Sequence, residues 1–243
     1  MTHWADKYQS FMQETTGVFV PSDLRNAKLH SIYPSDSEWF RRCLDALTEV
    51  ERAYAQELVN DIKRRDVPGA FVEFGVFQGH WLRLMFEMTE RAGLKDRELW
   101  GFDSFQGLSR PHPVYDTSFW KEGMYAASRA EVEKNLDVAR RPRIKLVEGF
   151  FTESLRGHEA ATLSHVAYAR IDCDIYEPAV ECLAFLSARL SNGAVLVLDD
   201  WTHDIDYGET RAFAEWVPTV PHLRFEFLCL GPWDHLYLRV WHR

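Results

Sequence analysis

From residue 70 onward, the chain alternates short strand-like segments with helix-like segments. Five apolar, strand-like segments lie at Ala70–Phe74, Leu99–Phe102, Ile144–Val147, Val166–Ile171 and Ala194–Leu198. Helix-like segments follow them at about His80–Ala92, Ser128–Val138, Pro178–Arg189 and Glu209–Trp216. Several of the strands are apolar on both faces, which is typical of parallel strands covered by helices. The alternation therefore predicts an α/β fold with a doubly wound, mostly parallel sheet.

The C-terminal segment departs from this alternation. Leu223–Leu230 and Leu236–Trp241 are both strand-like, and the connection between them is too short to hold a crossover helix. Parallel neighbours need such a crossover, whereas antiparallel strands can be joined by a tight turn. We therefore expect an antiparallel hairpin at one edge of the sheet.

The N-terminal segment has a different pattern again. Ser35 and Glu38 fit a capping box, and apolar residues then recur every three or four positions as far as Ile62. This predicts one long helix. We expect an N-terminal helical extension or lid at residues 1–67 and a single globular domain at residues 68–243.

Charge and composition exclude several classes of protein. The chain of 243 residues carries 28 Lys and Arg against 37 Asp and Glu, a net charge of −9, which disfavours a nucleic-acid partner. No apolar run approaches the roughly 20 residues of a membrane-spanning helix, and no signal peptide is visible at the N-terminus. The four cysteines show no metal or disulfide spacing. We expect a cytoplasmic protein without a membrane partner.

Glycines and acids follow the first two strands. Gly75 and Gly79 allow a sharp turn after Glu73, without the middle glycine of the dinucleotide fingerprint, and a plain tight turn is an equal interpretation. Asp103, followed by Ser104, ends the second strand, where an acid either accepts ribose hydroxyls or caps a turn. Together the two segments favour an adenosyl cofactor.

The third strand ends at a glycine followed by an aromatic residue. Gly149 and Phe150 fit the border of an adenine ring, and they fit a glycine bend beside a core phenylalanine equally well. The segment Ser104–Ala127 then stands out, because it is long, aperiodic and aromatic. Such loops are usually functional lids, and the alternative is a packed surface loop.

Four carboxylates follow the fourth and fifth strands. Asp172 and Asp174 lie two residues apart, on one side of an extended chain, and Asp199 and Asp200 end the next strand. Like charges brought together this closely need a cation between them, and oxygen-only ligands favour a hard ion such as Mg²⁺. The alternative is that these acids cap helices and turns. Trp201 and His203 follow directly and are candidates for contact with substrate, with His203 the only histidine expected near this site.

In order along the chain, these motifs resemble those of the macrocin O-methyltransferase family. The segments that carry the resemblance are Val72–Val76, Gly101–Leu108, Val147–Phe151, Arg170–Tyr176 and Leu198–Trp201. The family transfers methyl groups from S-adenosylmethionine to deoxysugar hydroxyls of macrolide, aminocoumarin and related antibiotics. The resemblance covers residues 68–203. Residues 1–34 and 108–127 match no motif, and there we expect substrate choice to reside.

The resemblance implies a role for each matching residue. The positions that match the cofactor site are Glu73, Gly75 and Gly79 at the methionine end, Asp103 and Ser104 at the ribose, Gly149 and Phe150 at the adenine, and Asp172. The positions that match the metal-binding carboxylates are Asp172, Asp199 and Asp200. Asp174 matches the general base. The expected cofactors are S-adenosylmethionine and Mg²⁺ or a similar divalent cation.

The chemistry agrees with these roles, because a sugar hydroxyl is a poor nucleophile unless a metal stabilises the developing alkoxide and a base accepts its proton. The expected partner is a glycosylated small molecule, and we expect at least a dimer. Three alternatives stay open: methylation of a catechol-like diol, a nicotinamide-dependent oxidoreductase, and a methyltransferase-like subunit without activity.

Overall fold

The computed structural model describes residues 38–202, 204–231 and 233–243. The chain divides into two compact units, Met1–Arg52 and Ala53–Arg243. Helix α3 (Glu38–Arg64) ends within the second unit, and its predicted cap, Ser35, lies outside the described residues. The predicted division at residue 67 stays a prediction.

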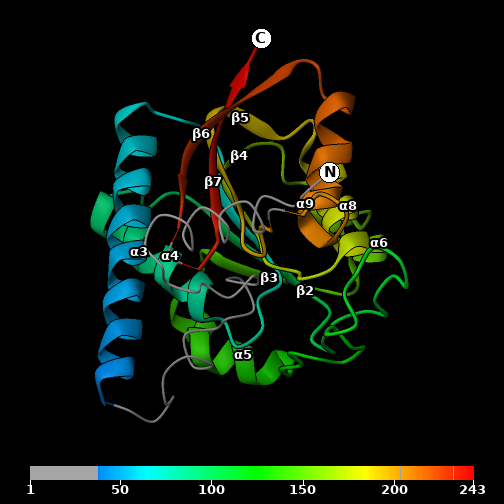
Figure 1. Cartoon of the computed structure of the whole chain (residues 1–243). Coiled ribbons are helices and arrows are strands. Elements are labelled where there is room, and N and C mark those ends of the chain that lie inside the picture. Colours follow the sequence, from blue (N-terminus) through cyan, green and yellow to red (C-terminus); the bar gives the residue numbers. More distant parts are fainter. Residues whose placement is uncertain (1–37, 203, 232) are drawn as a thin grey trace, which may run out of the picture. The chain divides into compact units, whose positions relative to one another are not determined.

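The second unit is built on one seven-stranded sheet with the order β3-β2-β1-β4-β5-β7-β6 (Figure 1). Its strands are β1 (Ala70–Phe74), β2 (Leu99–Asp103), β3 (Ile144–Glu148), β4 (Val166–Ile171), β5 (Leu190–Leu198), β6 (Leu223–Leu230) and β7 (Leu236–His242). Strands β1 to β5 pair in parallel, while β7 pairs antiparallel with both β5 and β6. The predicted α/β class and the C-terminal hairpin at the sheet edge are confirmed.

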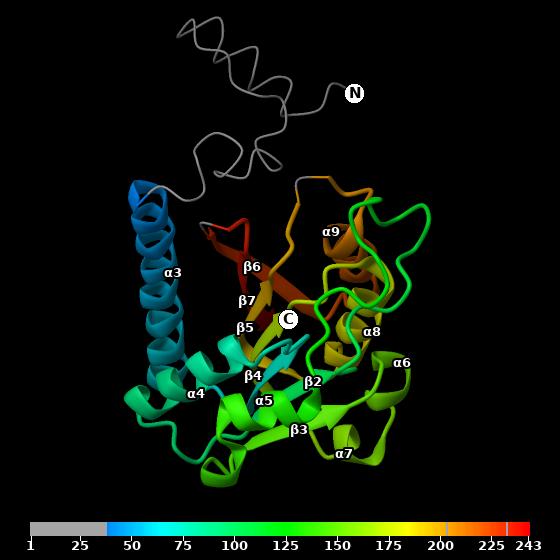
Figure 2. The same cartoon turned by 90° about the horizontal axis from the view of Figure 1, so that it is seen from below.

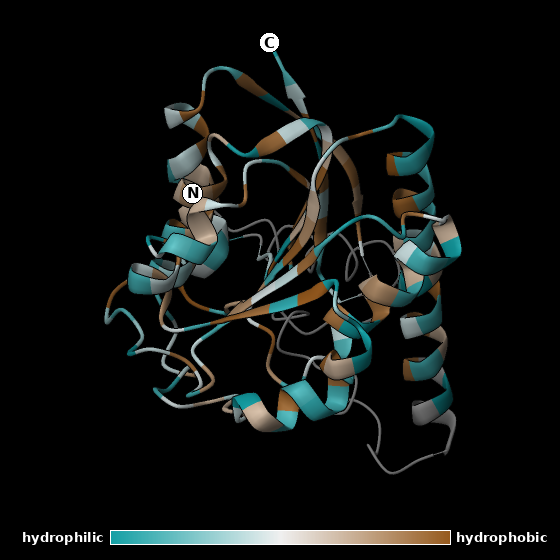
Figure 3. Ribbon diagram, turned by 180° about the vertical axis from the view of Figure 1, so that it is seen from behind, coloured by the Kyte–Doolittle hydropathy of each residue, from teal (hydrophilic) through white to brown (hydrophobic). Residues whose placement is uncertain are grey.

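Helices cover both faces of this sheet (Figure 2). On one face pack the end of α3, α4 (His80–Ala92) and α5 (Arg129–Leu136), and on the other α6 (Phe151–Ser154), α7 (His158–Ala161), α8 (Tyr176–Leu186) and α9 (Gly208–Trp216). Short 3₁₀ turns follow α5 at Val138–Arg140 and α9 at Val217–Thr219. All five residues of β1 and all six of β4 are buried, and Figure 3 shows the mostly hydrophobic strands between helices with hydrophilic outer faces. This explains why these strands are apolar on both faces.

The bounds of α5 and α8 differ from the predicted ones by one to three residues, and two differences from the predicted elements have a clear physical reason. Strand β5 begins at Leu190, four residues earlier than expected. Gly193 lies within the strand at φ 88°, and because a glycine in the sequence is typical of a turn, the prediction started after it. The two single-turn helices α6 and α7 were not predicted, since four residues are too few for a helical period.

Among the described residues, no helix is both long and apolar enough to cross a membrane.

Candidate functional site

Three carboxylates meet where β4 and β5 end. One oxygen each from Asp172, Asp199 and Asp200 lie within 4.8 Å of one another. Parallel strands end at the same edge of a sheet, and β4 pairs with β5 up to Ile171 and Leu198, so the following residues are brought side by side. A cation about 2.1–2.6 Å from each of three oxygens needs them about 4–5 Å apart at most. The spacing and the oxygen-only donors therefore fit a hard divalent cation.

A buried guanidinium and an imidazole already lie among these acids. Arg170 is buried within β4, its Nε is 3.5 Å from Oδ2 of Asp172, and its guanidinium also pairs with Asp199. His235, which precedes β7, places Nε2 3.0 Å from Oδ1 of Asp199. Sequence reasoning missed both residues, and the expectation that His203 is the only histidine near the site is wrong. The buried Oδ2 of Asp200 has no hydrogen-bond partner among the described residues. This oxygen is therefore available as a ligand of a further cation.

The fourth acid, Asp174, lies beside the cluster, but the backbone that leads to it differs from the predicted extended chain. Strand β4 ends at Ile171, and Asp174 has φ 64°, so the chain is not extended from Asp172 to Asp174 as the sequence suggested. Its carboxyl group nevertheless lies close enough to that of Asp200 for each to shift the other's pKa. Burial, with repulsion from Glu209 and Asp199, raises the pKa of Asp174 to about 7. A carboxyl with that pKa can exchange a proton near neutrality.

A fifth carboxylate, Glu209, lies beneath the cluster. It belongs to the first turn of α9 and is fully buried. Its Oε1 accepts a hydrogen bond from the backbone N–H of Cys173 at 3.0 Å, and its Oε2 accepts one from that of Asp200 at 3.2 Å. Sequence reasoning missed Glu209 as well, because an acid in a first helical turn is an ordinary favourable partner of the helix dipole.

The glycine turn after β1 lies against the end of β4. Gly75 has φ 86°, and a Cβ placed on it would lie 1.7 Å from the carbonyl oxygen of Asp172. Only glycine permits both this conformation and this approach. Glu73, two residues before Gly75, is buried, and its Oε2 has no hydrogen-bond partner among the described residues. Burial raises the pKa of Glu73 well above its usual value, although the charge of Arg170 opposes this.

The acid that ends β2 holds the glycine turn in place. Oδ2 of Asp103 accepts hydrogen bonds from the backbone N–H groups of Val76 (2.7 Å) and Phe77 (3.0 Å), and Oδ1 accepts one from Phe105 (2.6 Å). Three of its roughly four lone-pair positions are therefore occupied. Ser104 beside it donates to the carbonyl of Gly107 at 2.8 Å. The role of both residues at a ribose stays a prediction.

The remaining predicted cofactor residues lie at the same edge of the sheet. Gly79 is the N-cap of α4 at φ 83°. Gly149 follows β3, and the backbone N–H of Gly149 donates to the carbonyl of Asp103 at 2.9 Å. Phe150 is 37% exposed, which leaves its ring available to a ligand. The sheet thus brings the predicted cofactor and acid segments to one edge, while the role of each residue stays a prediction.

The long loop between β2 and α5 is anchored rather than free. Buried Asp116 accepts hydrogen bonds from the backbone N–H groups of His112 (2.7 Å) and Tyr176 (2.8 Å), which ties the loop to the start of α8. The carbonyl of Tyr115 accepts one from Gly208 at the start of α9 (2.8 Å). The loop also carries exposed Tyr125, whose pKa is raised by partial burial and by the charges of the aspartate cluster. It therefore borders the acids, as a substrate-choosing segment would.

The two predicted substrate contacts have different outcomes. The ring of Trp201 packs edge-on against Phe213 at 5.9 Å and joins the core between α9 and the sheet. His203 lies outside the described residues. Contact of either residue with substrate stays a prediction.

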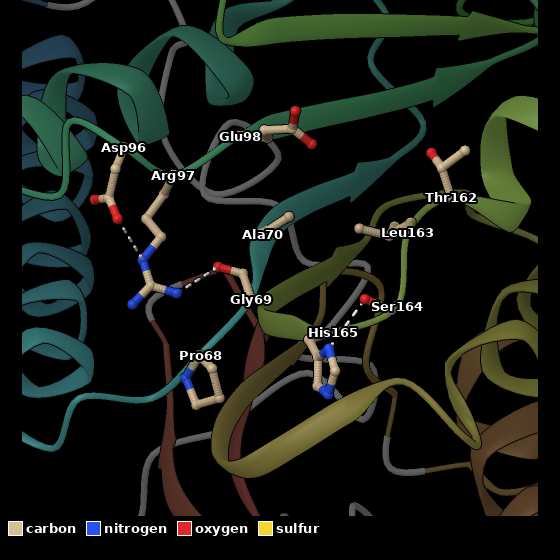
Figure 4. Close-up of a pocket in the computed structure, with 10 residues that line it drawn as sticks. All are labelled: Pro68, Gly69, Ala70, Asp96, Arg97, Glu98, Thr162, Leu163, Ser164 and His165. Carbon is tan, nitrogen blue, oxygen red and sulfur yellow. Dashed lines mark hydrogen bonds and ion pairs between the residues drawn. The ribbon is translucent and has the colours of Figure 1, made fainter.

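A separate cavity of about 340 Å³ lies at the opposite edge of the sheet (Figure 4). It is lined by residues at the amino ends of β1, β2 and β4, where Arg97 donates to the carbonyl of Gly69 at 3.2 Å and Ser164 hydrogen-bonds to His165 at 3.0 Å. None of the candidate site residues lines it. Ligands of such sheets bind at the carboxyl edge, which favours the acid cluster as the functional site.

Two relatives of this chain are named as O-methyltransferases. It is 28% identical over 160 residues to demethyldecarbamoylnovobiocin O-methyltransferase from Streptomyces niveus, covering 60% of this chain and 58% of that protein. It is 29% identical over 157 residues to 8-demethyl-8-(2,3-dimethoxy-alpha-L-rhamnosyl)-tetracenomycin-C 4'-O-methyltransferase from Streptomyces olivaceus, covering 61% and 59%. The chain thus spans just under three fifths of the length of these relatives.

Solved structures share the fold. The O-methyltransferase NovP superimposes with a TM-score of 0.66 at 24% identity, covering 79% of each chain. CalS11, a calicheamicin methyltransferase, superimposes with a TM-score of 0.61 at 23% identity, covering 97% of this chain and 91% of the other. The model of the macrocin O-methyltransferase family matches residues 46–214, which include every predicted site residue. The protein therefore belongs to the macrocin O-methyltransferase family.

Proposed function

We propose that this protein transfers a methyl group from S-adenosylmethionine to a sugar hydroxyl of a glycosylated small molecule. The observation that carries this proposal is the cluster of Asp172, Asp199 and Asp200, with the carboxyl of Asp174 beside it, in a chain of this family. The relative from Streptomyces olivaceus is named for methylation on a rhamnosyl group, which supports a sugar as acceptor.

The residues present fit a divalent cation and a cationic methyl donor. Asp172, Asp199 and Asp200 would hold the metal, since their oxygens lie close enough to share one ion and Oδ2 of Asp200 has no other partner among the described residues. A bound Mg²⁺ supplies positive charge that stabilises the negative charge developing on the hydroxyl oxygen. The buried Oε2 of Glu73, which has no hydrogen-bond partner among the described residues, would be available to a polar group of the cofactor.

Asp174 is the proposed base. A bound S-adenosylmethionine would supply an electrophilic methyl group, whose C–S bond would break as the O–C bond forms, so that a neutral thioether would leave. The hydroxyl proton passes to a carboxylate oxygen of Asp174. Its pKa of about 7, raised chiefly by burial, makes it a stronger base than an exposed aspartate. The anchored loop at residues 104–127 would limit the access of water to this reaction.

The substitution Asp174→Asn tests the assignment directly. It removes the proton acceptor while keeping the size of the side chain, so we expect kcat to fall about 10²–10⁴-fold with affinity for S-adenosylhomocysteine unchanged within about twofold. The matched control is Asp206→Asn, because Asp206 is exposed and lies outside the acid cluster. Full turnover by the Asp174 variant would exclude it as the base.

The acceptor class needs its own experiment. Glycosides with free vicinal sugar hydroxyls, and matched catechol-bearing aglycones, are incubated with S-adenosylmethionine and Mg²⁺. Mass spectrometry then locates the added methyl group. We expect methylation on the sugar fragment, whereas methylation of the catechol alone would overturn the proposed acceptor. Assembly into at least a dimer stays a prediction, which light scattering can check.

A further inference from the structure

Helix α9 reaches both acid-bearing loops through a single side chain. The backbone N–H of Cys173, between Asp172 and Asp174, and the backbone N–H of Asp200 both donate to the carboxylate of Glu209, at 3.0 and 3.2 Å. These two amides follow different strands, β4 and β5. One rigid carboxylate therefore fixes the distance between the two loops.

The burial of Glu209 needs an explanation beyond packing. Its side chain is fully buried, and no ion pair joins it to a cation among the described residues. Burial, and then the charge of Asp200, raise its pKa well above the usual value. A buried acid without a counter-ion is unfavourable unless hydrogen bonds compensate for it, and here they come from the two loops that carry the cluster.

The neighbouring residue gives a comparison within the same turn of α9. The hydroxyl of Thr210 is also buried, accepts a hydrogen bond from the backbone N–H of Thr202 at 2.8 Å and donates to the Thr202 carbonyl at 2.9 Å. Its hydrogen bonds to Thr202 attach α9 to the chain after β5, and none is found from it to Cys173 or Asp200 among the described residues. Thr210 therefore serves only to attach the helix. Comparing variants of Thr210 and Glu209 separates attachment of α9 from positioning of the acids.

We propose that Glu209 is a positioning residue. It keeps the loop that carries Asp172 and Asp174 at a fixed distance from the loop that carries Asp199 and Asp200, so that the three metal ligands and the base keep their positions relative to one another. This inference rests on the proposed function, because it assumes that the cluster binds a divalent cation. Glu209 does not touch the reacting atoms. It acts through the two hydrogen bonds that it accepts from backbone N–H groups.

The experiment compares three variants with the unaltered chain. Glu209→Gln turns one acceptor oxygen into an amide that faces a backbone N–H, so one of the two bonds is lost. Thr210→Val removes the two hydrogen bonds that the buried hydroxyl of the same helical turn makes with Thr202. Glu215→Gln makes the same chemical change as Glu209→Gln on an exposed position of α9. For each variant we measure Mg²⁺ affinity by calorimetry, S-adenosylhomocysteine affinity, Tm, kcat and KM.

For Glu209→Gln we expect Mg²⁺ affinity to fall at least tenfold and kcat to fall at least tenfold, with S-adenosylhomocysteine affinity unchanged within about twofold. Thr210→Val lowers Tm but leaves Mg²⁺ affinity intact, and Glu215→Gln changes neither. Should Glu209→Gln fail to fold, Glu209→Asp replaces it. That variant keeps the charge but is one methylene too short to reach both amides, so it weakens Mg²⁺ binding in the same direction.

The outcomes separate this inference from the proposed function. Mg²⁺ binding by the unaltered chain, with equal affinity in the Glu209 variant, overturns the positioning role alone. Equal losses of Mg²⁺ affinity in the Glu209 and Thr210 variants also overturn it, since helix attachment would then suffice. Absence of Mg²⁺ binding to the unaltered chain overturns the metal site of the proposed function, and the inference with it.

Discussion

At the scale of single residues, the acid cluster is only partly neutralised by the protein itself. Arg170 faces Asp172 and Asp199, and its guanidinium lies 4.1 Å from the centre of the Trp81 ring. One guanidinium cannot balance four aspartates and the buried Glu209 beside them. The remaining negative charge is what a divalent cation would neutralise.

Arg170 and a bound cation should therefore both neutralise the negative charge of the aspartate cluster. Removing one partner of a buried ion pair costs about 3–5 kcal/mol, so we expect Arg170→Met to lower the free energy of unfolding by about that much in EDTA. Because the acids then lack their internal cation, Mg²⁺ should stabilise this variant more than it stabilises the unaltered chain. Urea unfolding with and without Mg²⁺ measures both effects.

A half-buried arginine away from the acids provides the control. Arg189 donates to the carbonyls of Leu163 (3.0 Å) and Phe185 (2.7 Å), and no ion pair with a carboxylate is found for it among the described residues. Arg189→Met should lose stability without gaining any response to Mg²⁺. If Mg²⁺ stabilised the Arg170 variant and the unaltered chain equally, the shared-charge account would be wrong.

Gly75 gives a second prediction at this scale. Gly75→Ala places a methyl group 1.7 Å from the carbonyl oxygen of Asp172, so β1 and β4 must separate at the site. We expect a loss of about 3 kcal/mol or more in the free energy of unfolding and loss of S-adenosylhomocysteine binding. Gly93→Ala is the matched control, because Gly93 has φ 74° with nothing within 4 Å of its added Cβ. It isolates the backbone strain, about 1–2 kcal/mol.

At the scale of elements, Asp116 helps to anchor the loop at residues 104–127. It accepts hydrogen bonds from the backbone N–H of His112 within the loop and from that of Tyr176 at the start of α8. Asp116→Asn replaces one acceptor oxygen by an amide, so the loop should detach more often from α8. We expect trypsin to cleave at exposed Lys121 several times faster, with little change in Tm, because the loop lies outside the central sheet.

Limited proteolysis followed by mass spectrometry identifies the cleaved bond. Asp206→Asn again serves as control, since it lies outside the loop. Unchanged cleavage at Lys121 in the Asp116 variant would mean that other contacts, such as Tyr115 with Gly208 and Arg211, hold the loop without Asp116.

The regular elements were largely predictable because each has a local signal. Strands β1 and β4 have the predicted bounds, and so does α4, which lies between two glycine caps, Gly79 and Gly93. The anchoring of the loop was not predictable. Asp116 is one polar residue among many, and its partner in α8 is 60 residues away in sequence.

At the scale of the whole molecule, the topology explains which part of the site the sequence could reveal. The aspartates were predictable because parallel strands bring their ends together whatever the side chains between them. Arg170, His235 and Glu209 were not. Arg170 sits inside an apolar strand, His235 follows a hairpin turn, and Glu209 starts a helix, so none of them shares a local pattern with the acids they contact.

The central claim is that the carboxyl edge of this sheet binds an adenosyl cofactor beside a divalent cation. The most direct test is a calorimetric titration of the purified, unaltered protein with S-adenosylhomocysteine, first with Mg²⁺ and then with EDTA. We predict one cofactor bound per chain in both conditions, because Asp103 holds the glycine turn without a metal ion, and a further heat of Mg²⁺ binding that EDTA abolishes. Absence of cofactor binding in both conditions would contradict the account.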